Sequence, residues 1–154
     1  MVFAFWAKET QLSAFRKVCE NLSRLASAHP DGVGICQVVG LQAVPPSTET
    51  RTEITRLMRD AVGGRLMHYS IVHEGSGFKA ASVRAIVSAS HMLARTTTHL
   101  AVFNSVAEAA KWHAKEQQLL KRKESAEQIS AIISDLQQEH QRYLGRSAGS
   151  NLTS

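Results

Sequence analysis

The spacing of apolar residues changes within the stretch from Leu66 to Arg95, and this change suggests how the chain is organised. Residues Leu66 to His73 form a short and largely apolar run, which is typical of a buried strand. Glu74-Gly75-Ser76-Gly77 interrupts this run, because two glycines within three residues supply backbone conformations that bulky residues do not adopt. From Phe78 onward, apolar residues recur at helical spacing around much of the circumference. The pattern therefore predicts an interior strand, a tight turn and an interior helix.

Three further apolar runs have the length and composition of strands: Val2 to Ala7, Val33 to Val39 and Leu100 to Phe103. The second is apolar at nearly every position, as is typical of a parallel sheet that is covered on both faces. A helical pattern follows each run. A strand followed by a helix, four times over, predicts an α/β domain of residues 1 to 114 with a four-stranded, mainly parallel sheet and flanking helices.

Residues suited to helix ends mark the limits of these helices. Thr10, Ser47 and Ser105 are each placed to cap a helix N-terminus, and Ser105 with Glu108 has the spacing of a capping box. Proline and glycine after His29, and later Gly63-Gly64, are expected to end the first two helices. The residues predicted to face inward are Leu12, Phe15, Val18, Leu22 and Leu25, then Ile54, Leu57, Met58, Ala61 and Val62, and in the last helix Val106, Ala109, Ala110 and Trp112.

The segment from residue 115 to residue 145 is expected to be a helical extension of this domain. Ser125 and Gln128 form a second capping box ahead of a narrow apolar stripe, and the opposite face is charged or carries amides. Such an amphipathic helix must lie on its own domain, pair with a second copy or receive a partner. Residues 146 to 154 are expected to be a disordered tail. The predicted contact residues of the helix are Ile129, Ile132, Ile133, Leu136 and Tyr143.

Charge and composition narrow the functional classes. The chain has 154 residues, of which 44% are apolar, and this suits one globular domain with an appendage. Its formal net charge is +5, but residues 1 to 110 carry 11 Lys/Arg against 8 Asp/Glu, and residues 111 to 154 carry 7 against 5. Because the charge is spread rather than concentrated, we expect no specific nucleic-acid partner.

The remaining composition indicates a cytoplasmic protein without a metal or cofactor. Cys19 and Cys36 lie in apolar segments with no zinc spacing, and are expected to be buried, reduced thiols. No apolar run approaches the roughly 18 residues needed to cross a bilayer, and the first residues lack the basic region of a signal peptide. His68 and His73 are an odd number of residues apart in a strand, so they should point to opposite faces and share no metal.

Several segments resemble the small bacterial STAS-like proteins, which are related to anti-sigma-factor antagonists and are grouped with CRAL-TRIO folds. The resemblance rests on the segment from His29 to Gly32, on Pro45-Pro46 followed by Arg51, on Val72 to Arg84, and on Val102 to Trp112. It covers nearly all of the first 114 residues. It implies a non-enzymatic regulatory or scaffolding module that binds another protein, such as a signalling or structural partner, and a homodimer is one arrangement that we expect.

The resemblance also points to the turn after the third strand as the binding surface. Its residues are Glu74, Gly75, Ser76, Gly77, Phe78 and, in the following helix, Arg84. In anti-sigma-factor antagonists a serine at this place is switched by phosphorylation. Glycine occupies the corresponding position here and Ser76 follows it, so Ser76 is the candidate phosphosite. A phosphate there would lie near a helix N-terminus, where negative charge is favoured.

Two alternatives use the same turn. Backbone N–H groups at a helix start can hold an anion, so the chain could bind or carry a small apolar or anionic ligand. An enzyme that uses the turn is the other alternative, and it requires access to His68, His73 or Glu74. No Walker sequence, dinucleotide fingerprint, HExxH motif or nucleophile elbow is present, so no catalytic residue is assigned.

Overall fold

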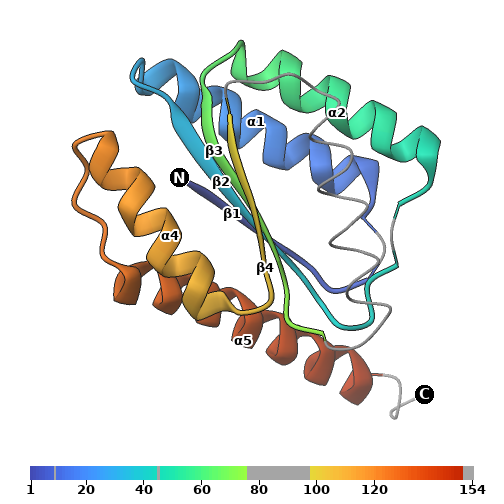
Figure 1. The fold of residues 1–154 in the computed structure, drawn as a ribbon. Coiled ribbons are helices and arrows are strands. Elements are labelled where there is room, and N and C mark those ends of the chain that lie inside the picture. Colours follow the sequence, from blue (N-terminus) through green and yellow to red (C-terminus); the bar gives the residue numbers. More distant parts are fainter. Residues whose placement is uncertain (9, 45, 76–97, 151–154) are drawn as a thin grey trace.

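The computed structural model describes residues 1–8, 10–44, 46–75 and 98–150 (Figure 1). Its sheet contains four parallel strands in the order β1-β2-β3-β4. The strands are β1 (Val2–Trp6), β2 (Val33–Val39), β3 (Leu66–His73) and β4 (His99–Phe103). The predicted α/β class and the predicted strands are thereby confirmed, with ends that differ by one residue at most. The predicted helix from Phe78 lies outside the described residues.

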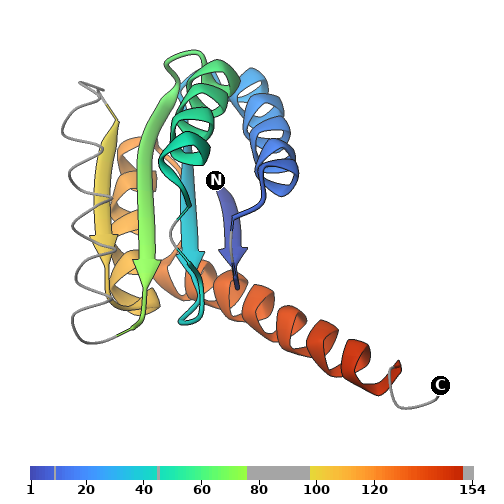
Figure 2. The ribbon, with the colours of Figure 1, turned by 90° about the vertical axis from the view of Figure 1, so that its right-hand side faces the viewer.

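Among the described residues, two helices lie on each face of the sheet, as can be followed in Figures 1 and 2. The helices α1 (Leu12–Ala28) and α2 (Thr48–Val62) pack on one face. On the other face lie α4 (Val106–Leu119) and α5 (Ala126–Ser150). None of the helices in the described ranges is long and apolar enough to cross a membrane.

The face under α1 and α2 is filled almost entirely by apolar side chains. Phe15 and Leu22 of α1 and Ile35 of β2 are at most 1% exposed. Met58 and Val62 close the layer from α2, and the rest of the predicted stripe of α2 is partly buried against them. Because these residues recur at three- and four-residue steps, their burial follows directly from the sequence pattern.

Most of the predicted helix ends are confirmed. The hydroxyl oxygens of Ser47 and Ser105 accept hydrogen bonds from the N–H groups three residues later, and Gly63 ends α2 in the left-handed conformation. The prediction for Thr10 is wrong: the residue that precedes α1 is Gln11, and no side chain caps the helix there. Since Thr10 lies one residue before the N-cap position, its hydroxyl is out of register with the first free N–H groups.

The C-terminal segment packs on its own domain. Both hydrogen bonds of the second capping box are present, from Ser125 N–H to Gln128 Oε1 at 2.8 Å and from Gln128 N–H to Ser125 Oγ at 3.3 Å. Helix α4 continues to Leu119, across the expected boundary at residue 115, and α5 continues to Ser150, past the expected start of the tail. Figure 2 shows the C-terminal part of α5 extending beyond the β1 edge of the sheet.

Candidate functional site

The carboxyl ends of the four strands meet at one edge of the sheet, because all of the strands are parallel. In α/β proteins, ligands usually bind at this edge, in the crevice formed where the strand order reverses. Here the order runs from β1 to β4 without reversal, so the four described strands form no such crevice. The described loops at this edge (the carboxyl edge) therefore do not border a crevice of this kind.

The turn after β3 contacts α5 at this edge. Gln137 donates a hydrogen bond from Nε2 to Glu74 Oε2 at 3.3 Å, across 63 residues of sequence. His73, which is 3% exposed, accepts a hydrogen bond from Gly75 N–H through Nδ1 at 3.0 Å. Two regions that the sequence analysis predicted separately, the turn and the C-terminal helix, are thus adjacent. The other predicted turn residues, Ser76, Gly77, Phe78 and Arg84, lie outside the described residues.

The predicted contact residues of α5 divide into two groups. Ile129 and Ile133 are each 1% exposed and pack against the sheet, so they hold the helix on its own domain. Ile132 and Leu136 are 43% and 37% exposed and remain available to a partner. Tyr143 lies in α5, in a part whose side chains are not described.

A loop that the sequence analysis did not flag adds apolar surface to the carboxyl edge. Leu41 and Val44, in the loop that follows β2, are 64% and 57% exposed. The start of this loop is fixed by a hydrogen bond of 2.7 Å from Gly40 N–H to the carbonyl oxygen of Trp6, at the end of β1. Isolated apolar residues are common on protein surfaces, but two within four residues beside the sheet edge form a small apolar surface that a partner can contact. The sequence does contain a signal for this surface: two large apolar residues lie in a loop, where no helical or strand spacing predicts that they are buried.

A second group of polar side chains is buried between β3 and α4. Ser70 Oγ and His113 Nε2 are 2.6 Å apart, and both residues are 0% exposed. The ring of His68 lies against those of His113 and Trp112, with centroids 5.1 and 6.1 Å away. Burial lowers the pKa of His68 to about 4 and that of His113 to about 3, so both rings are neutral at neutral pH.

This buried group has an incomplete set of hydrogen bonds. Both ring nitrogens of His68, Nδ1 of His113 and Nε2 of Gln117 have no hydrogen-bond partner within the described ranges. The ring of His68 lies so close over Gly34 that a side chain at Gly34 would overlap it. The sequence analysis predicted Val106, Ala109, Ala110 and Trp112 as the inward residues of α4 and missed His113 and Gln117. Continuing the helical spacing of residues 106, 109 and 110 leads to residues 113, 114 and 117, and so would have identified both positions.

A serine beside a histidine is also the arrangement of an activated nucleophile. Here the hydroxyl proton of Ser70 can pass toward His113, but both side chains are fully buried. Substrate has no route to them through either of the two hollows described below, since neither is lined by His68, Ser70 or His113. The contact is therefore better explained as one that holds α4 on the sheet.

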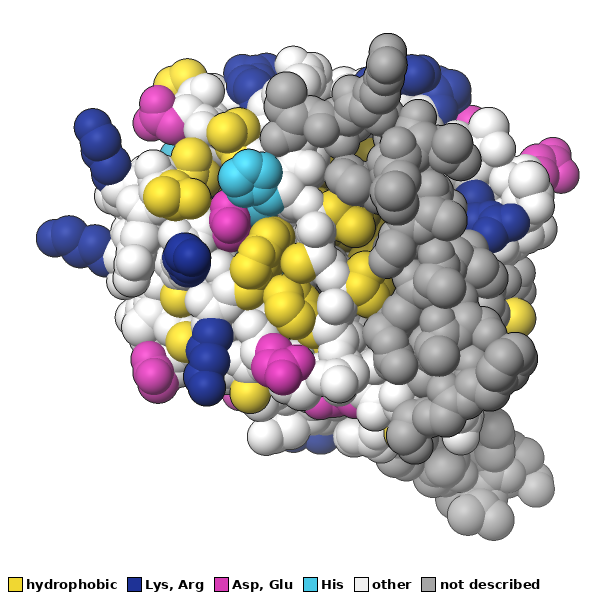
Figure 3. All heavy atoms as spheres, in the orientation of Figure 1, with side chains coloured by type: hydrophobic (Ala, Val, Ile, Leu, Met, Phe, Trp, Pro, Cys, Tyr) yellow, Lys and Arg dark blue, Asp and Glu magenta, His cyan; other side chains and the backbone are white. Residues whose placement is uncertain are grey.

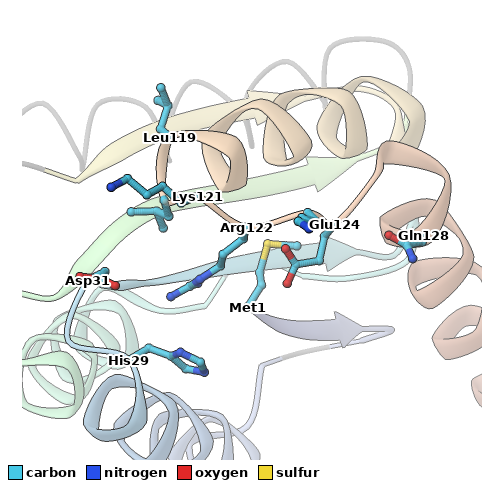
Figure 4. Close-up of a pocket in the computed structure, with 10 residues that line it drawn as sticks. Met1, His29, Asp31, Leu119, Lys121, Arg122, Glu124 and Gln128 are labelled. Carbon is cyan, nitrogen blue, oxygen red and sulfur yellow. The ribbon is translucent and has the colours of Figure 1, made fainter.

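A hollow of about 810 Å³ lies at the opposite, amino-terminal edge of the sheet (Figure 4). In Figure 4 the side chain of Arg122 reaches from the connection between α4 and α5 toward the segment that contains Asp31. Arg122 donates to the carbonyl oxygen of Gly32 at 2.7 Å and to Gln117 Oε1 at 3.3 Å, which ties this connection to the start of β2. Both signs of charge line the open hollow, including Lys121, Lys123, Asp31 and Glu124, and this does not suit an apolar ligand. A shallower hollow of about 390 Å³ lies along α5.

Metal and thiol chemistry find no support in the described ranges. No group of three or more His, Cys, Asp or Glu side chains there is arranged to hold a metal ion. Cys19 and Cys36 are free and buried, as predicted. Burial raises the pKa of each thiol to about 11, which disfavours the reactive thiolate.

Helix α2 carries arginine side chains beside acidic ones. Arg56 of α2 pairs with Glu53 at 2.7 Å and with Asp60 at 3.1 Å, and Arg59 lies 3.8 Å from Asp60. On the face shown in Figure 3, Lys and Arg side chains are scattered among acidic and neutral ones. The described side chains therefore offer a polyanion no continuous basic surface in this view.

Comparison with known proteins identifies no relative. No family model, no curated protein and no solved structure matches this chain. The STAS-like resemblance of the sequence therefore stays a prediction.

Proposed function

We propose that this chain is a non-enzymatic, STAS-like interaction module that binds another protein at the carboxyl edge of its sheet. The observation that carries the proposal is the exposed apolar pair of Leu41 and Val44 in the loop after β2. At the same edge, Glu74 is held by Gln137 of α5, and Ile132 and Leu136 of that helix are exposed. A regulatory or scaffolding partner with an apolar patch and a hydrogen-bond donor for Glu74 would fit this edge.

The arrangement favours binding to a surface over catalysis. Of the three residues that an enzyme would need, His68 and His73 are buried, and Glu74 is exposed and hydrogen-bonded. Each hollow described above is lined by other residues.

Phosphorylation of Ser76 remains part of the proposal as a switch. Ser76 follows Gly75 directly, and Glu74 already brings one negative charge to the contact with Gln137. A phosphate beside it would add charge of the same sign, and a partner that donates a hydrogen bond to Glu74 would then bind more tightly.

The experiment uses point variants of the full chain. Deleting the C-terminal segment would remove Ile129 and Ile133 from the core cluster that contains Cys36, Val38 and Val72, and would test folding rather than binding. The full chain would be used to capture partners from its native cell, and each captured partner would then be purified and titrated against the chain. We expect the double variant Leu41→Glu/Val44→Glu to weaken binding of that partner at least about tenfold, because charge would enter an apolar contact.

Ala131→Glu is the matched control, because Ala131 is exposed on α5 outside the apolar pair of that helix. It should leave the affinity unchanged. Equal binding by the chain and the Leu41→Glu/Val44→Glu variant, with both folded, would refute the carboxyl edge as the contact. Turnover of a substrate by the purified chain would refute the non-enzymatic assignment.

A further inference from the structure

Strand β1 forms one edge of the sheet and has the composition of a strand that pairs. Its sequence, VFAFW, contains no charged residue and no proline. Natural edge strands usually carry such residues, because an unguarded row of N–H and C=O groups invites another strand. Within the described ranges, no strand pairs with the outer side of β1.

The pattern of β1 is self-complementary about Ala4. Val2, Ala4 and Trp6 belong to the core under α1 and α2, whereas Phe3 and Phe5 pack toward α4 and α5. In an antiparallel pair about Ala4, each Phe3 would meet the Phe5 of the second copy, and each Val2 would meet its Trp6. A two-fold axis perpendicular to the sheet keeps like faces together, as a closed dimer requires.

Helix α1 presents an uncharged flank above the β1 edge. Arg16 reaches Glu53 of α2 at 3.9 Å, so the opposite flank of α1 faces away from α2. That flank carries Ala14, Val18, Asn21 and Leu25, which recur at helical spacing and include no charge. Two copies related by the same axis would bring these flanks together.

Helix α5 overhangs the same edge on the other face. It crosses β1, where His140 lies against Phe5 with ring centroids 5.2 Å apart, and then continues past the sheet (Figure 2). The charges of its last described side chains, Glu139 and Arg142, are of opposite sign and lie 3.0 Å apart. An antiparallel second copy of the helix could exchange these partners.

From these features we infer that the chain forms a two-fold dimer through β1, which joins two four-stranded sheets into one of eight strands. The partner is a second copy of this chain, because one two-fold axis would bring together the β1 strands, the α1 flanks and the α5 overhangs of the two copies. The interface uses the β1 edge and leaves Leu41, Val44 and Glu74 free for another protein. The dimer and the proposed function can therefore fail independently.

Sedimentation of the full chain tests the assembly. We expect a mass of about 34 kDa, twice the 16.9 kDa of one chain, at a concentration of about 50 µM. A mass of one chain at this concentration overturns the inference.

A cysteine cross-link tests the register. Antiparallel residues that face each other have Cα atoms about 4.5 to 5.5 Å apart, which suits a disulfide. Ala4→Cys should therefore form a disulfide-linked dimer under mild oxidation. The control Ala7→Cys should not, because Ala7 follows the strand and would lie about 20 Å from its copy. A dimer that is linked at residue 7 and not at residue 4 contradicts the register.

A variant on the surface of α1 tests the dimer without any change inside the sheet. Ala14→Glu/Asn21→Glu places like charges on the α1 flank and should weaken the dimer at least about tenfold. Ser13→Glu/Ser27→Glu adds the same charge to exposed positions of α1 away from this flank and should leave the mass unchanged. A dimer that withstands the first double variant uses another face, and this result would also overturn the inference.

Discussion

The two faces of the sheet are built differently although each is covered by two helices. Under α1 and α2, the buried polar side chains among the described residues are Gln37, which accepts a hydrogen bond from Trp6 Nε1 at 3.0 Å, and His73, which pairs in register with Val39 of that layer. Under α4 and α5, apolar residues share the layer with His68, Ser70, His113 and Gln117. The first face is stabilised by apolar burial almost alone, whereas the second also requires that two histidines stay neutral.

This difference predicts that acid acts through the second face. The unfolded chain gains protons on His68 and His113 as the pH falls below about 6.5, whereas the folded chain does not until about pH 4 and pH 3. Above pH 6.5 both histidines are neutral in the folded and the unfolded chain and make no pH-dependent difference, and stability is lost as the pH falls from 6.5 toward 4. With two histidines the free energy of unfolding falls by at most about 3 kcal/mol per pH unit, or on the order of 5 kcal/mol between pH 6.5 and 4.5.

Urea denaturation across this pH range measures the effect. Removing one of the two groups, as in His68→Leu, should reduce the slope by about half. A free energy of unfolding that is level between pH 6.5 and 4.5 would show that the buried histidines do not behave differently from those of the unfolded chain.

Large-to-small substitutions test whether both faces belong to one cooperative unit. Leu22→Ala under α1 and Ile133→Ala under α5 should each lower the free energy of unfolding by about 2 to 5 kcal/mol, because both side chains are at most 1% exposed. Leu22→Ala should leave the pH slope unchanged. Ile132→Ala, at an exposed position one residue away, should change stability by less than about 1 kcal/mol. A near-neutral Ile133→Ala would mean that α5 is an appendage and not part of the fold.

The first face was predictable from sequence because its signals are local. Apolar residues at helical steps, continuous apolar strands and a glycine after α2 led to α1, α2, β2 and β3 with few errors. The strand ends at Val33, Val39, Leu66 and His73 were all predicted as observed. Parallel pairing followed from the strand–helix alternation, since each crossover returns the chain in the same direction.

The second face was less predictable because its side chains meet across long stretches of sequence. Ser70 and His113 are 43 residues apart, and Glu74 and Gln137 are 63 residues apart. Neither pair forms a motif, and polar residues on an inward stripe are easily assigned to solvent. The sequence analysis named Ile129 and Ile133 as contact residues but left their partner surface open for a similar reason, because an amphipathic stripe does not reveal which surface it covers.

Replacing His68 by an apolar residue should stabilise the protein at neutral pH. Both ring nitrogens of His68 lack a hydrogen-bond partner among the described residues, so burial of this side chain is unfavourable. His68→Leu should raise the free energy of unfolding by about 1 to 2 kcal/mol at pH 7, since Leu fills a similar volume beside Gly34 and Trp112. Ser70→Val is the comparison: it removes the hydroxyl bonded to His113 and should destabilise. A loss of stability in His68→Leu would imply that the histidine has a favourable polar contact in solution.

The smallest effects are expected at the helix caps, where the two faces should behave alike. Ser47→Ala at α2 and Ser105→Ala at α4 each remove a hydroxyl that accepts an N–H hydrogen bond at 3.1 Å, and each should lower the free energy of unfolding by about 1 kcal/mol. Thr10→Ala should change it by less than about 0.5 kcal/mol, because Thr10 caps no helix. Equal losses at Ser47 and Ser105 would show that local hydrogen bonds are independent of the face on which a helix lies, so that the contrast between the faces resides in the buried side chains. A loss at Ser105 much larger than that at Ser47 would instead indicate that the start of α4 also positions His113 against Ser70.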